Sequence, residues 1–191
     1  SNGTDLTGAD FSEDIAFLLT SSIGREATSY GNVPRYEDFQ DRFTHAESPF
    51  VISQKFGGKV YDLFKFVAID AGETANKYKI SIDNITPAIN DQNYGSFVVQ
   101  FRDINNLDTD RESLEPAFSV DLDPSSQSYI AREIGDENIF FDFDNDTKSQ
   151  KIVVDGNHSR QSDLFRVVLS DDLIAGNVPK DAIPMGFRGP S

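Results

Sequence analysis

The chain has 191 residues, and its 17 lysines and arginines against 32 aspartates and glutamates give it a net charge of −15. A chain this acidic repels phosphate backbones and anionic lipid surfaces, so neither direct nucleic-acid binding nor membrane insertion is expected. It has no cysteine and only two histidines, His45 and His158. Disulfide frameworks, thiolate metal sites and cysteine nucleophiles are therefore excluded.

The first 48 residues differ in pattern from the rest of the chain. Residues 10–19 mix acidic and apolar side chains, while Tyr36, Phe39 and Phe43 recur at the spacing of a short amphipathic helix. We therefore expect residues 1–48 to form an N-terminal α/β segment that packs on a larger body.

Residues 49–191 are expected to form that body, and it should be rich in strands. The residue 60–69 segment is apolar on both faces, which is typical of a central strand. Further strands are predicted from alternation and turn residues at 51–54, 78–83, 97–101, 138–143, 151–155 and 164–169. The fold class is thus predicted as α+β, a β-rich body of mixed or antiparallel sheets with short flanking helices. The only methionine is Met185 and no closing element follows it, so we expect a piece excised from a longer chain.

The best-marked element is a helix predicted over residues 124–134. Asp123 suits the N-cap position, and Pro124 suits the first turn. Gly135 suits the position just after the helix end.

One face of this predicted helix should be buried. Tyr129, Ile130 and Ile134 are expected to face the β body, because Ile130 and Ile134 lie one turn apart. Arg132 and Glu133 should be more exposed or paired with other side chains.

The acids of Asp142–Asp146 have the alternate spacing of a calcium loop. An EF-hand loop needs Gly at its sixth position and Glu at its twelfth, where this chain has Thr147 and Val153. A polar hairpin turn is the favoured interpretation, although a looser cation site stays open. No metal or cofactor is expected.

Catalytic patterns are weak throughout the chain. His158 lies in a polar stretch and is interpreted as an exposed loop residue, and no Gly-x-Ser-x-Gly elbow accompanies either histidine. Gly57–Lys59 lacks the flanking residues of a phosphate-binding loop, so a turn is favoured there. An enzymatic role is not expected.

The stretch Ser119–Asp136 resembles the hallmark of the tail sheath proteins of contractile-tailed, myovirus-type bacteriophages. That pattern has Leu-Asp-Pro, a few polar residues, Tyr-Ile-Ala-Arg, one variable residue and Ile-Gly-Asp, and this chain keeps every fixed element. The motif positions are Asp123, Pro124, Tyr129, Ile130, Ala131, Arg132, Ile134 and Gly135. Four further pieces are similar to the family in the same order, and they are Val51–Gln54 with Tyr61–Phe66, Ala75–Ile82, Tyr94–Val99 and Gly186–Gly189. The residues in these segments are most similar to those in the sheath proteins of very large phages.

The resemblance implies a structural role for these motif residues and for the chain. Sheath subunits surround the tail tube in stacked rings and rearrange on contraction, which drives the tube through the host envelope. The implied partners are other sheath subunits, the tail tube and the baseplate. The implied location is the virion tail, after synthesis in the bacterial cytoplasm. The family's C-terminal domain, which links subunits, has no counterpart before Ser191, so the isolated chain is expected to be a monomer.

Two hypotheses from other classes remain open. One is a calcium-dependent carbohydrate-binding or adhesin-like β module that uses Asp142–Asp146. The other is a hydrolase with two unrecognised carboxylates. Glycan binding measured with and without calcium separates the adhesin hypothesis from the sheath hypothesis.

Overall fold

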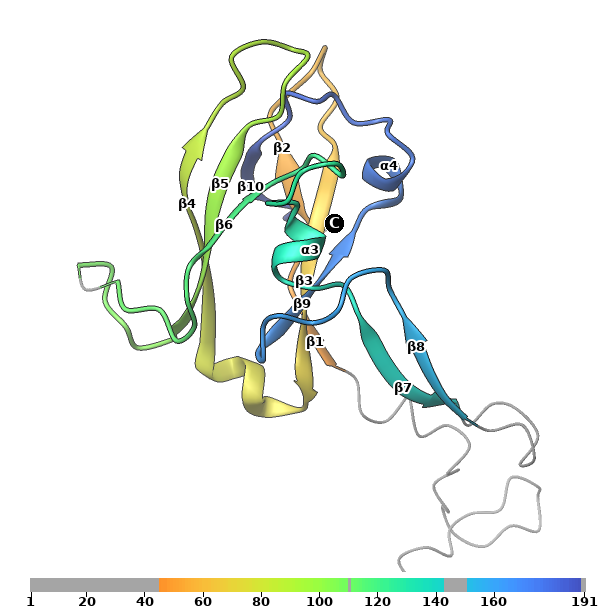
Figure 1. Ribbon diagram of the computed structural model, residues 1–191. Coiled ribbons are helices and arrows are strands. Elements are labelled where there is room, and N and C mark those ends of the chain that lie inside the picture. Colours follow the sequence, from red (N-terminus) through yellow and green to blue (C-terminus); the bar gives the residue numbers. More distant parts are fainter. Residues whose placement is uncertain (1–44, 110, 143–150, 190–191) are drawn as a thin grey trace, which may run out of the picture. The chain divides into compact units, whose positions relative to one another are not determined.

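The computed structural model describes residues 45–109, 111–142 and 151–189 (Figure 1). Within these ranges, residues 45–141 and 152–189 belong to one compact unit. The helix expected near residues 36–43 and the segment at 10–19 lie outside the described residues. So does the predicted turn of Asp142–Asp146, except for Asp142 itself.

The larger sheet is built around one long central strand. Its five strands are β1 (His45–Glu47), β2 (Val51–Ser53), β3 (Asp62–Ala71), β9 (Phe165–Leu169) and β10 (Pro184–Phe187). Phe64 of β3 is opposite Val51 on one side and Leu169 on the other, so β3 has strands along both edges. β1 also pairs with β3, and β10 pairs with β2. The prediction of a central strand at 60–69 is therefore confirmed.

The second sheet has three antiparallel strands in sequential order. They are β4 (Tyr78–Thr86), β5 (Ser96–Asp103) and β6 (Phe118–Asp121). Phe97, Val99 and Phe101 alternate along β5 and are at most 1% exposed. This alternation is the period-two pattern that predicted the strand.

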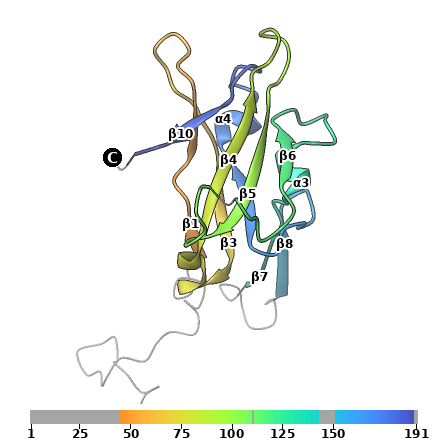
Figure 2. The same ribbon diagram turned by 90° about the vertical axis from the view of Figure 1, so that its left-hand side faces the viewer.

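Aromatic rings from the two sheets form the core between them. Phe64 of β3 stacks on Phe97 of β5 with centroids 5.7 Å apart. Phe101 of β5 also packs against Phe165 of β9, at 4.9 Å. Figures 1 and 2 show the two sheets as separate layers, with β4 and β5 in front of β3 in Figure 2. The phenylalanine content of the sequence thus supplies the contacts that join the layers.

The remaining strands form a separate two-stranded sheet. β7 (Asn138–Asp142) pairs with β8 (Lys151–Asp155). Both strands lie where the sequence predicts them, at 138–143 and 151–155.

Helices are few and short in the described part of the chain. They are the 3-10 helix η2 (Glu73–Lys77), the helix α3 (Ile130–Glu133) and the helix α4 (Asp171–Ile174). The described residues are β-rich with antiparallel sheets, as predicted for the body. The predictions from the sequence did not include β1, β6, β10, η2 or α4.

The predicted helix at 124–134 is wrong in its first half. α3 is a single turn that starts at Ile130, and its N-cap is Tyr129, whose side chain makes no capping hydrogen bond. Asp123 is therefore not a helix cap, and Pro124 does not lie in the first helical turn. The prediction for Gly135 is confirmed, because it follows the helix with φ of +101°.

Candidate functional site

The residues before α3 form a tight turn that is held by side-chain oxygens. Asp123 Oδ1 accepts hydrogen bonds from the backbone N–H and the hydroxyl of Ser125, at 2.9 and 2.7 Å. Asp121 accepts from the Asp123 N–H and from the Ser126 hydroxyl, at 3.1 and 2.6 Å. Because short polar side chains satisfy these backbone groups locally, the helix cannot extend upstream. The same hydrogen bonds from Ser125 lower the pKa of Asp123.

The motif residues after this turn lie at the centre of the fold. Ile130, Ala131 and Ile134 are completely buried, and Tyr129 is 7% exposed. The expectation that one helix face packs on the β body is thus confirmed. Arg132 is exposed, also as predicted.

Gly135 fixes how the chain leaves α3. A Cβ atom at Gly135 would lie 2.6 Å from the Arg160 Cα, closer than real Cβ contacts allow. Its carbonyl accepts the Val167 N–H of β9 at 2.9 Å, which joins the motif to the large sheet. The segment after α3 and the segment after β8 therefore cross in direct backbone contact.

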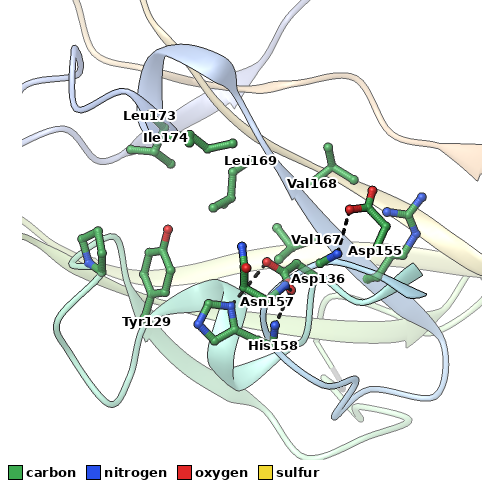
Figure 3. Close-up of a pocket in the computed structure, with 13 residues that line it drawn as sticks. Tyr129, Asp136, Asp155, Asn157, His158, Val167, Val168, Leu169, Leu173 and Ile174 are labelled. Atoms are coloured by element: carbon green, nitrogen blue, oxygen red, sulfur yellow. Dashed lines mark hydrogen bonds and ion pairs between the residues drawn. The ribbon is translucent and has the colours of Figure 1, made fainter. Parts of the chain in front are cut away.

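A pocket of about 350 Å³ opens beside the motif (Figure 3). Two motif residues, Pro124 and Tyr129, contribute to its lining. The rest comes from β9 and α4 on one side and from the bases of β7 and β8 on the other. The structure therefore places Pro124 and Tyr129 at a surface pocket, apart from the fully buried motif residues.

Asp136 organises the polar side of this pocket. Its Oδ1 accepts the backbone N–H groups of Asn157 and His158, at 2.9 and 2.7 Å (Figure 3). Its Oδ2 lies 3.3 Å from His158 Nδ1, and the His158 ring packs edge-on against Tyr129. His158 lies in a loop, as predicted, but the prediction that it is exposed is wrong, since these contacts leave its side chain 25% exposed.

Two side chains at the pocket have shifted pKa values. Burial raises the pKa of Tyr129, and the nearby carboxylate of Asp136 raises it further. Burial lowers the pKa of Arg166, which the carboxylates of Glu47, Asp155 and Asp136 partly oppose. The pocket therefore contains a neutral phenol and a half-buried cation with acidic neighbours.

The lining of this pocket contains a histidine–carboxylate pair. His158 and Asp136 form a pair, but no serine, threonine or lysine is among the residues that line the pocket. The pair thus has no nucleophile beside it of the kind that a histidine and a carboxylate activate. No group of three or more His, Asp or Glu side chains that could hold a metal ion occurs within the described ranges.

Arg102 is an important residue that the sequence analysis did not identify. Its side chain is 2% exposed, and its five N–H groups donate to Ser81 Oγ, Asn106 Oδ1, the Leu107 carbonyl and Asp108 Oδ1. It occupies a polar position in the alternation of β5, which by itself predicts exposure. The signal that could have found it is the polar cluster Asn105–Asp110 a few residues downstream, which can fold back over the strand.

Comparisons with protein-family models, with curated protein sequences and with solved structures each found no match to this chain. Among the residues that the structure describes, no helix is long and apolar enough to span a membrane.

Proposed function

We propose that this chain is the body of a contractile tail sheath subunit of a bacteriophage, with an α+β fold and no enzymatic activity. The observation that carries the proposal is the resemblance of Ser119–Asp136 to the sheath hallmark. Burial supports this, because Ile130, Ala131 and Ile134 of that segment are completely buried. Side chains at such positions contribute to the core of a folded body.

The packing of the body supports a mechanical role. A sheath subunit must move as a near-rigid unit while its contacts with neighbours change. Stacked and edge-on rings join the two sheets, from Phe64 on Phe97 to Phe66 on Phe101. The Arg102 network fixes the loop after β5, and Gly135 fixes the exit from α3. These features would let the body transmit force without deforming.

In this proposal the partners are other sheath subunits, the tail tube and the baseplate, and the location is the virion tail. Gold-labelled antibodies raised against the chain would test this on intact particles of the phage that encodes it. We expect label along the whole tail between head and baseplate. Label confined to the head or to fibres, or no label on the particle, would contradict the proposal.

The alternative of a calcium-dependent adhesin module rests on Asp142–Asp146, of which Asp142 alone is described. A saturated calcium site raises stability by about 2.7 kcal/mol at a hundredfold excess over Kd. The sheath proposal predicts the same melting temperature in EDTA and in millimolar calcium. A rise of several degrees in calcium would favour the adhesin alternative.

A further inference from the structure

The pocket beside Tyr129 has an apolar wall and a polar wall. Leu169, Leu173 and Ile174 form the apolar wall, from the end of β9 and from α4. Figure 3 shows them across the pocket from Tyr129 and His158, with the Tyr129 hydroxyl pointing into the space between. A ligand that fits must therefore have an apolar face and a polar edge.

Several hydrogen-bonding groups on the polar wall are not used by the protein. Three side-chain groups on this wall have no hydrogen-bond partner among the described residues. They are the side-chain amide of Asn157, the hydroxyl of Tyr129 and the guanidinium of Arg166. Asp155 uses Oδ1 to accept the Gly156 N–H at 3.0 Å, and its second oxygen is not engaged. The wall thus offers donors and acceptors together.

This wall carries charges of both signs. A cationic group drawn to Asp136 and Asp155 also meets Arg166, and an anionic group drawn to Arg166 also meets the two carboxylates. Like charges brought this close in a partly buried site are destabilising. A hydroxyl group both donates and accepts, so a set of hydroxyls can satisfy this mixed wall without any net charge.

We propose that this pocket binds a neutral sugar, with one face of its ring on the apolar wall and its hydroxyls toward Asn157, Asp155, Arg166 and Tyr129. The volume of about 350 Å³ lies at the lower end of the range of about 300–1,000 Å³ that is usual for small-molecule sites. The site needs no metal and is separate from Asp142–Asp146. The inference does not depend on the sheath proposal, because a sheath body exposed on a virion could carry this site or lack it.

Amide-detected NMR titration of the whole chain tests the inference. The probes are the methyl glycosides of glucose, galactose, mannose and N-acetylglucosamine, in EDTA. We expect saturable shifts with at least one of them, centred on the amides of Tyr129, Asn157, His158 and Leu173. Methylammonium and sulfate, as charged probes, should produce no saturable shift at these amides.

Two variants make the test specific. Asn157→Ala removes an exposed side-chain amide but keeps the backbone N–H that Asp136 accepts, so the fold should be retained. We expect it to weaken sugar binding by about fivefold or more, the usual effect of one lost hydrogen bond. Arg132→Ala, an exposed change outside this pocket, should leave the affinity unchanged. The inference is overturned if no sugar gives saturable shifts, if the shifts centre elsewhere, if a charged probe binds there, or if Asn157→Ala has no effect.

Discussion

At the scale of single residues, the buried guanidinium of Arg102 is the feature on which the loop after β5 depends. It donates hydrogen bonds to the side-chain oxygen of Asn106, to the Leu107 carbonyl and to Asp108 Oδ1, the last at 3.0 Å. Arg102→Met should lower the free energy of unfolding by about 1.5–3 kcal/mol, because the hydrogen bonds donated by a buried charged group are lost. Urea unfolding measures this. Arg188→Met is the matched control, since Arg188 is 51% exposed and pairs with Asp62; it should cost less than about 1 kcal/mol. Equal losses in the two variants would contradict the role given to Arg102.

Ile130 tests whether the motif is part of the core. It is completely buried, so Ile130→Ala should lower the free energy of unfolding by about 2–4 kcal/mol through lost contacts and a residual cavity. Arg132→Ala on the same helical turn should change it by less than about 0.5 kcal/mol, because that side chain is exposed. Thermal melts of both variants provide the comparison. A parental melting temperature for Ile130→Ala would show that the helix does not pack as described.

The contribution of Asp123 to the stability of the turn before α3 should decrease at acid pH. Its pKa is lowered from 3.8 in the folded state by hydrogen bonds from Ser125. The unfolded chain therefore takes up the proton first as pH falls, so this stabilisation is present above pH 3.8 and is lost below it. Asp123→Asn keeps an acceptor oxygen without the charge. The stability difference between parent and variant should shrink between about pH 6 and about pH 2.5, which bracket ordinary carboxyl titration. A difference independent of pH would show that the Asp123 charge does not contribute.

At the scale of elements, the crossing of the chain at Gly135 is the most constrained point. A Cβ there would approach the Arg160 backbone to 2.6 Å, and φ is +101°. Gly135→Ala should therefore cost more than about 2 kcal/mol, from strain and from displaced backbone. Gly176→Ala is the control, because Gly176 also has a positive φ but has open space around its Cα. Its cost should be limited to about 1 kcal/mol of backbone strain. If the two variants unfold at the same urea concentration, the close crossing does not stabilise the fold.

The strands could be predicted from the sequence because their signal is local. Phe97, Val99 and Phe101 alternate on one face of β5, and the apolar run of β3 indicates a strand with neighbours on both sides. The start of α3 could not be predicted in this way. Asp123, Pro124 and Gly135 match the residue preferences of helix ends, but the competing hydrogen bonds of Asp121 and Ser126 decide the outcome. Short strands such as β10 are also hard to predict, since they depend on a distant partner, here β2.

The candidate site was only partly predictable for a related reason. Tyr129 and Pro124 belong to the recognised motif, yet their pocket exists because β9, α4 and the bases of β7 and β8 meet beside them. His158 gives no sequence signal of its contact with Asp136, which is 22 residues away. In the sequence, Arg102 has the pattern of an outward-facing strand residue. Its burial depends on the loop that follows β5.

At the scale of the whole molecule, net charge and exposed surface predict the association state. The charge of −15 opposes self-approach at low salt, and a Debye length of about 8 Å at physiological ionic strength weakens that repulsion. The exposed apolar groove near Met185 and Phe187 has few lining residues. Sedimentation velocity should therefore give one species of 21.2 kDa in both low and high salt. A stable ring or tube formed by this chain would contradict that expectation.

The central claim is that this body is the repeated unit of a contractile sheath. Electron cryomicroscopy of the encoding phage, with tails in the extended and contracted states, tests it most directly. The account predicts that the two-layered body of residues 45–141 and 152–189 fits the sheath density at every subunit position in both states. Its internal structure should be unchanged while its contacts with neighbours differ. Sheath density in either state that cannot contain this body would contradict the account.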